Sequence, residues 1–106
     1  MTPDAELSRD LDFHTALDLM RMGHAVARAA WTGAGPALPI ALVFIRGRAA
    51  KAAFQPMVRH LGRDAEFTVH DHIDALFEGE GAVPQVVVGW SISQDDLLAN
   101  DWFMVP

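Results

Sequence analysis

The sequence contains no cysteine, which excludes disulfide bonds, thiolate metal ligands and a cysteine nucleophile. It also lacks any apolar run near the ~20 residues that a membrane span requires, so we expect no membrane partner. Basic residues are few, with 8 Lys and Arg against 14 Asp and Glu, and they are scattered along the chain. Binding to a nucleic-acid polymer depends on clustered cations, so we expect no such partner.

The N-terminus and the length predict a single cytoplasmic domain. Residues 1–6 are acidic and lack the apolar segment of a signal peptide, and 106 residues is near the usual size of one domain. Residues 1–11 are polar and include a proline, so we expect a flexible lead-in there and the domain over 12–106. The hydrophobic content of 51% exceeds what one small core easily buries. This excess of apolar surface predicts self-association.

Two helices are predicted near the ends of the domain. Apolar residues recur at helical spacing over 13–20, with Asp12 as a plausible N-cap and Gly23 as the residue that ends the helix. Ser93 followed by Asp96 forms a capping-box pattern, which predicts a short helix immediately after it.

The segments between these helices carry β-type patterns. The stretch 49–61 is compatible with a further helix, although Pro56 lies inside it, and 78–81 is expected to be a turn. This order, with connections too short for repeated crossover helices, predicts an α+β fold with a small antiparallel sheet. The expected strands lie at 24–31, 40–45, 66–72, 86–92 and 102–105.

The sequence offers no complete catalytic or metal site. His70 and His72 share a strand face and could, with Asp74, bind a metal ion or serve a small hydrolase that acts on nucleotide signals. A metal site needs a third ligand with supporting contacts, and no further histidine spacing supplies one. Ser91 lies in a partial G-x-S-x-G pattern that lacks the final glycine. We therefore expect no catalytic residue, no metal and no cofactor.

Three tryptophans lie at the boundaries of the expected elements. Trp31 adjoins the glycine-rich stretch 32–36, Trp90 follows a glycine, and Trp102 follows the short helix. An indole beside glycines can stack on a planar ligand, and such stacking is worth ~1–3 kcal/mol per base. A tryptophan at an element boundary can equally fill the core. We expect Trp90 and Trp102 to fill the core, and leave both roles open for Trp31.

Two gapped motifs lie near the two ends of the domain. The residues of the first motif are Asp12, Phe13, Ala16, Leu17, Met20, Arg21, Gly23, Val26, Ala27, Arg28, Trp31, Thr32, Gly33, Ala34 and Gly35; those of the second are Trp90, Ser93, Gln94, Asp96, Leu97, Leu98, Ala99, Asp101 and Trp102. Both motifs resemble the second Thoeris anti-defence family of small phage proteins, the Thoeris anti-defence 2-like domain. The residues 47–66 between them have no counterpart that aligns, and we expect an insertion there.

The resemblance implies a small α+β domain that assembles as a homo-oligomer, a dimer or tetramer. It implies binding of a cyclic nucleotide signal of the cyclic ADP-ribose type, and of cyclic dinucleotides in some members, without breaking any bond. Trp31 would stack on the ligand, and Gly33 and Gly35 would let the backbone approach it. The other candidate ligand-binding residues are Arg28, Thr32, Trp90, Ser93, Gln94 and Asp96.

Three departures from the family pattern bear on the ligand. Thr32 stands where the family usually has Asn, Ala34 where it has Lys, and Gly89 where it has Pro. The loop therefore lacks an amide and a cation, which could contact a base and a phosphate. Arg28 or Arg46 could compensate. The leading hypothesis is sequestration of a cyclic nucleotide in the bacterial cytoplasm, which inhibits anti-phage defence; the alternative is a protein-interaction module of the same fold without a ligand pocket.

Overall fold

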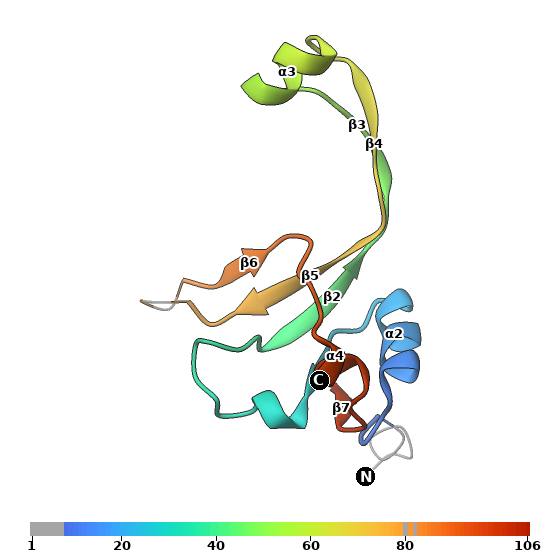
Figure 1. Cartoon of the computed structure of the whole chain (residues 1–106), viewed down its shortest axis with the longest axis vertical. Coiled ribbons are helices and arrows are strands. Elements are labelled where there is room, and N and C mark those ends of the chain that lie inside the picture. Colours follow the sequence, from blue (N-terminus) through green and yellow to red (C-terminus); the bar gives the residue numbers. More distant parts are fainter. Residues whose placement is uncertain (1–7, 80, 82) are drawn as a thin grey trace.

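The computed structural model describes residues 8–79, 81 and 83–106, which form one α+β domain (Figure 1). Residue 80 of the expected turn over 78–81 lies outside the described residues, as do residues 1–7 of the expected lead-in. In chain order the elements are α2 (Phe13–Arg21), β1 (Val26–Arg28), the 3-10 turn η1 (Ala29–Trp31), β2 (Ala41–Ile45), β3 (Arg48–Lys51), α3 (Gln55–Leu61), β4 (Glu66–Val69), β5 (His72–Phe77), β6 (Gln85–Val87), α4 (Gln94–Leu97) and β7 (Trp102–Met104).

Five strands form an antiparallel sheet in the order β6-β5-β2-β1-β7, so the predicted α+β fold with a small antiparallel sheet is confirmed. Its strands were predicted only in part. The expected strand over 66–72 ends at Val69 and pairs with β3 outside this sheet, β5 was not expected beyond residue 72, and residues 29–31 and 88–92 are not in strands. Helix α2 packs against β1, β2 and β7, and the backbone of Leu11 pairs with that of Trp102 along the outer edge of β7. Met104 also donates its backbone N–H to the carbonyl oxygen of Ser8, at 2.9 Å. This sheet with α2 and α4 is called the body below. None of the helices in the described part of the chain has the length and apolar character to cross a bilayer.

The ends of α2 follow the predicted signals. The Asp12 carboxylate accepts a hydrogen bond of 2.8 Å from the backbone N–H of Thr15, so the N-cap prediction is confirmed. Ala16 and Met20 are buried on the side that faces the sheet. Gly23 then adopts a φ of 100°, a left-handed conformation that glycine allows without steric cost, and the helix ends there.

Strands β2 and β5 continue beyond the sheet as one long hairpin. Ile45 pairs with His72 and Arg48 pairs with Val69, so two residues separate the inner and outer ladders on each side and the register is kept. The prediction of a helix over 49–61 is wrong for residues 49–54, of which the first three belong to β3 and the other three are irregular. The helix there begins only at Gln55, with proline in its first turn, where the missing N–H costs nothing.

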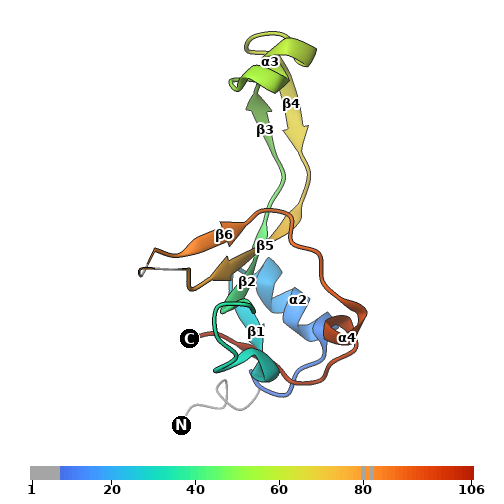
Figure 2. The same cartoon turned by 60° about the vertical axis from the view of Figure 1, so that its left-hand side comes forward.

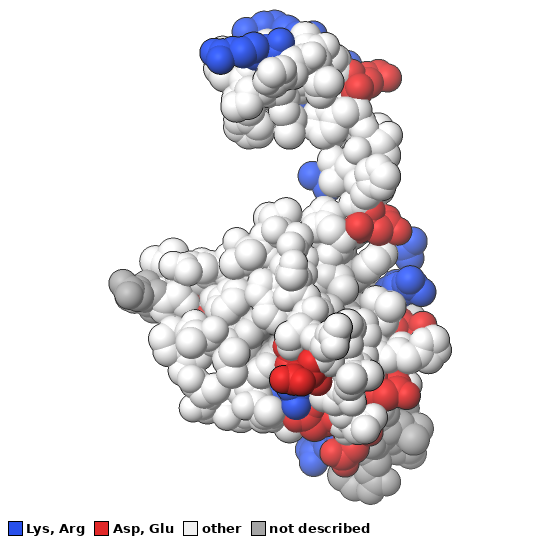
Figure 3. Space-filling model, viewed as in Figure 1, with Lys and Arg blue, Asp and Glu red and all other residues white. Residues whose placement is uncertain are grey.

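The outer half of this hairpin, residues 48–69 with α3 at its tip, is called the arm below. Figures 1 and 2 show it projecting from the body, and the space-filling view in Figure 3 shows a hollow between its tip and the body. The radius of gyration is 16.6 Å, whereas a compact chain of this length would have about 13 Å. Gly47 lies at the base of the arm, where a Cβ atom would come within 2.5 Å of the Val69 carbonyl oxygen. The close crossing of the two chain segments therefore requires glycine.

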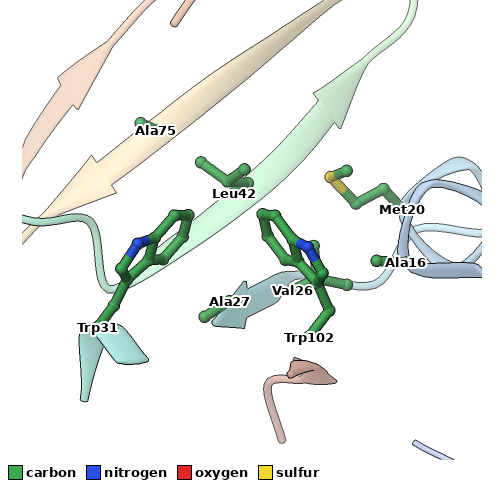
Figure 4. Close-up of a cluster of buried hydrophobic side chains, with 8 residues drawn as sticks. All are labelled: Ala16, Met20, Val26, Ala27, Trp31, Leu42, Ala75 and Trp102. Carbon is green, nitrogen blue, oxygen red and sulfur yellow. The ribbon is translucent and has the colours of Figure 1, made fainter. Parts of the chain in front are cut away.

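The core lies in the body, between the sheet and α2 (Figure 4). Trp102, Met20, Leu42 and Val26 are its largest fully buried side chains. The Trp102 indole N–H donates a 2.9 Å hydrogen bond to the carbonyl oxygen of Asp96, so the ring is buried without leaving its polar group unsatisfied. The prediction that Trp102 fills the core is confirmed.

Candidate functional site

A cavity of about 400 Å³ lies where β1 passes into η1 and the glycine-rich loop. This volume falls within the range of small-molecule sites, about 300–1,000 Å³. Five of its lining residues come from positions after the loop: three on the way into β2, one directly after β5 and one within β7. The lining residues are Ala27, Arg28, Trp31, Thr32, Gly33, Gly35, Leu38, Pro39, Ile40, Glu78 and Phe103.

The loop after Trp31 is shaped by two backbone hydrogen bonds and two glycines. The N–H of Thr32 donates to the carbonyl oxygen of Ala29, and the N–H of Ala34 donates to that of Trp31, both at 3.1 Å. Gly33 and Gly35 have φ values of 73° and 83°, which other residues adopt only with strain. Nothing lies within 4 Å of the position of a Cβ atom at either glycine, so a ligand can approach the backbone there.

Trp31 belongs both to the core and to the wall of the cavity. Its relative exposure is 7%, and its ring packs edge-on against Trp102, at 5.2 Å between ring centroids, and against Trp90, at 5.8 Å. Figure 4 shows the Trp31 and Trp102 side chains next to one another beneath Leu42. Neighbouring indoles hold the ring in place, and only its small exposed part faces the cavity.

Arg28 joins the two sequence motifs through an ion-pair network. Its Nη1 lies 2.6 Å from Asp96 Oδ1, and its Nε lies 2.7 Å from Asp101 Oδ1. The hydrogen bond to Asp101, followed by that to Asp96, raises the pKa of Arg28. The Arg28 guanidinium is also the main cause that lowers the pKa of Asp101, with a further contribution from the backbone N–H of Ala30. Much of the hydrogen-bonding capacity of Arg28 is therefore used within the protein.

The candidate residues of the second motif lie outside the lining of this cavity. Ser93 caps α4 by accepting a 3.2 Å hydrogen bond from the backbone N–H of Asp96, and its hydroxyl lies 2.9 Å from Asp96 Oδ2. The predicted N-cap at Ser93 and the short helix after it are thus confirmed, whereas the Asp96 carboxylate contacts the Ser93 hydroxyl instead of completing a capping box through the backbone. Gln94 opens α4, and the Trp90 ring packs edge-on against the Trp31 ring without itself lining the cavity. That Trp90, Ser93, Gln94 and Asp96 read a ligand stays a prediction.

The cavity also includes residues that sequence reasoning missed. Leu38, Pro39 and Ile40 belong to the segment before β2, Glu78 follows β5, and Phe103 lies in β7. They come from three separate parts of the chain, and only the pairing of strands brings them together. No local signal in the sequence marks Glu78 or Phe103 as lining residues. The apolar residues 38–40 could have been proposed, because they follow a glycine-rich loop.

Of the two histidines considered for chemistry, His72 uses both ring nitrogens in local contacts. His72 Nδ1 lies 2.9 Å from the carbonyl oxygen of His70, and His72 Nε2 lies 3.4 Å from Asp74 Oδ1. Asp74 also accepts a hydrogen bond from the backbone N–H of Gly89. Within residues 8–79, 81 and 83–106, no three His, Asp or Glu side chains are grouped so as to hold a metal ion.

The two motifs resembling the anti-defence family thus meet in space, through Arg28 with Asp96 and Asp101 and through Trp31 with Trp90 and Trp102. A family model, described as the Thoeris anti-defense 2-like domain, matches residues 11–105. The chain belongs to this family. Membership in the Thoeris anti-defense family assigns the protein a phage anti-defence role. No curated protein matches the chain closely enough to extend the assignment.

Proposed function

We propose that this Thoeris anti-defense 2-like protein binds a cyclic nucleotide immune signal in the cavity beside Trp31 and sequesters it unchanged. The signal is of the cyclic ADP-ribose type, with cyclic dinucleotides as further ligands. Held by the protein in the bacterial cytoplasm, it does not reach its effector. The protein acts as a homo-oligomer, a dimer or tetramer, and needs no cofactor because no bond is broken.

The observation that carries this proposal is the position of the cavity on the family's first motif. Arg28, Trp31, Thr32, Gly33 and Gly35, all candidate ligand-binding residues, line it together. A fixed indole supports contact with a base, and open glycine backbone supports close approach of a sugar or phosphate. Such a site requires no nucleophile or general base.

The charged lining residues of the cavity limit which parts of the ligand it can bind tightly. Arg28 is the single Lys or Arg among the lining residues, and its guanidinium already pairs with Asp96 and Asp101. Glu78 adds a negative charge to the lining. We therefore expect the base and sugar to supply most of the affinity, with the phosphates directed toward solvent or toward a second subunit.

Titration calorimetry with a panel of cyclic ADP-ribose isomers and cyclic dinucleotides tests the proposal. Bound ligand is then released by heat and analysed by mass spectrometry. Submicromolar binding with the ligand recovered intact supports sequestration. Recovery of a cleaved ligand would establish a hydrolase instead, and absence of binding across the panel would favour the protein-interaction module.

A matched pair of variants tests the location of the site. Thr32→Trp places a bulky ring at an exposed lining residue and should weaken binding at least tenfold. Ala37→Trp places the same ring on the same loop at an exposed residue outside the lining and should leave binding unchanged. Equal effects of the two variants would contradict the assignment of this cavity.

A further inference from the structure

A second groove lies on the body, apart from the cavity beside Trp31. Its volume is about 440 Å³, which also falls within the range of small-molecule sites. Helix α2, strand β2, the start of β5 and residues 89–90 after β6 form its walls. Among the described residues, none lines both this groove and the cavity. We call it the α2 groove, and it is a site separate from the one proposed for the nucleotide.

The floor of the α2 groove is apolar and aromatic. Phe44 pairs with Ile73 across β2 and β5, and the backbone N–H of Trp90 donates a 2.9 Å hydrogen bond to the Ile73 carbonyl oxygen. Strand pairing and this hydrogen bond hold the two aromatic residues in place, so the floor is a preformed surface for one flat apolar group. The side chains of the floor are all partly buried and pack against the core: Leu17, Phe44, Ile73 and Trp90.

The rim of the α2 groove carries a positive charge without a partner. Arg21 lies four residues after Leu17, so both side chains are on the face of α2 that lines the groove. Arg21 is exposed, and no carboxylate of the described residues forms an ion pair with it. Its guanidinium group is therefore available to an anion, unlike that of Arg28, which pairs with two carboxylates.

The other polar residues of the groove favour a ligand with a single negative charge. Asp71 is the lining carboxylate, and its Oδ1 accepts a 2.6 Å hydrogen bond from the backbone N–H of Gly47. A ligand with two phosphates would bring two charges to one guanidinium beside this carboxylate, and one of them would stay uncompensated. A carboxylate matches the planar guanidinium group of Arg21 through two parallel N–H···O bonds. The groove is therefore better suited to a monocarboxylate than to a cyclic nucleotide.

We propose that the α2 groove is a second small-molecule site, which binds an aromatic monocarboxylate. The ring of the ligand lies against Phe44 and Trp90, and its carboxylate accepts two hydrogen bonds from Arg21. Both parts are needed, because the floor supplies apolar contact without charge and the rim supplies charge without apolar contact. The site does not depend on nucleotide binding, although Trp90 packs against Trp31 with 5.8 Å between ring centroids, so the two sites adjoin the same pair of indoles.

An NMR titration of the isotope-labelled full chain with hydrocinnamate tests the site. The chain has three tryptophans, so its spectrum holds three indole N–H signals. Hydrocinnamate should bind at submillimolar concentration and shift the Trp90 signal, which is the signal absent from Trp90→Phe, while the signal of the fully buried Trp102 stays in place. Hydrocinnamamide, which lacks the charge, and propionate, which lacks the ring, should each bind at least tenfold more weakly. Equal affinity for the acid and its amide, or no shift of the Trp90 signal, would overturn the proposal.

Matched arginine variants locate the carboxylate contact. Arg21→Gln removes the charge from the rim and should weaken hydrocinnamate binding at least tenfold. Arg59→Gln makes the same change at an exposed residue of the arm and should leave the affinity unchanged. Equal effects of these two variants would refute the contact with Arg21.

One further variant separates the α2 groove from the cavity beside Trp31. Thr32→Trp obstructs that cavity but lies outside the groove, so it should leave hydrocinnamate binding unchanged. Loss of binding in Thr32→Trp would place the probe in the cavity and overturn the proposal. No nucleotide is used in these titrations, so the proposed groove site and nucleotide sequestration can fail separately.

Discussion

One long β-hairpin runs through both the body and the arm, yet the two regions bury their side chains very differently. In the body, α2 and the crossing strands enclose Trp102, Met20, Leu42 and Val26 completely. In the arm, two strands and a short helix enclose little more than Ala52. A two-stranded ribbon has no second layer to pack against, so it gains little from the hydrophobic effect on its own. Stability of this protein is therefore concentrated in the body, and the arm's apolar residues remain available for contacts between molecules.

Matched aromatic truncations should give the largest difference between the two regions. Trp102→Ala removes a fully buried ring and its hydrogen bond to Asp96, and should lower the free energy of unfolding by about 3–5 kcal/mol. Phe54→Ala removes an exposed ring from the arm and should change it by less than about 0.5 kcal/mol. Urea unfolding followed by circular dichroism, at a concentration where the protein is monomeric, measures both. A large loss from Phe54→Ala would mean that the arm packs on its own body.

The ion-pair network of the body should come next in size. Asp101→Asn leaves the partly buried Arg28 with one carboxylate partner, and should cost about 1–3 kcal/mol of unfolding free energy. Asp18→Asn breaks the exposed pair of α2 with His14 and should cost close to nothing. The same urea experiment compares the two variants. Equal losses would contradict a special role for Arg28 in joining the two motifs.

Acid pH should lower the free energy of unfolding of the body, because it protonates a carboxylate of this ion-pair network. Because the pKa of Asp101 is lowered in the folded protein, the unfolded chain takes up the proton first as the pH falls. The stability that this carboxylate contributes is present above about pH 4 and is lost as the pH falls further, through the lower pKa of the folded state. Unfolding curves between pH 7 and pH 3 should show a smaller decline for Asp101→Asn than for the wild-type protein. Parallel declines would assign the acid sensitivity to other carboxylates.

Nucleotide affinity should respond to charge in the body but not in the arm, and this is the smallest expected effect. Glu78→Gln removes a negative charge from the cavity lining and should tighten binding of an anionic cyclic nucleotide about fivefold. Glu66→Gln makes the same change on the arm and should not alter the affinity. Calorimetry at low and high salt separates these outcomes, since the gain should shrink as salt screens the charge. If Glu66→Gln alone tightened binding, the ligand site would lie on the arm instead.

The sequence predicted the fold best where a single element carries its own signal. The cap at Asp12, the turn at Gly23 and the cap at Ser93 were all predictable, because the groups involved lie within four residues of one another. The segment 49–61 was predicted wrongly in part because its alanines favour a helix, whereas pairing with a distant strand places residues 49–51 in β3. Its pairing partner is β4, which lies beyond α3, and local sequence does not report such a partner.

The candidate site was predictable only in its first half. Trp31, Thr32, Gly33 and Gly35 are neighbours in the chain, and all of them line the cavity. Glu78 and Phe103 join them because β5 and β7 lie in the same sheet as β1 and β2, which is a property of strand order rather than of local sequence.

The sequence by itself determined the α+β class, the family and the local caps, because periodicity, turn residues and motif spacing act over short distances along the chain. Tertiary structure alone decided that Arg28 meets Asp96 and Asp101, that Trp31 is held between two other indoles, and that residues 48–69 leave the body as an arm. These features depend on which distant segments pair and which surfaces remain uncovered. Both are set by the packing of the whole chain.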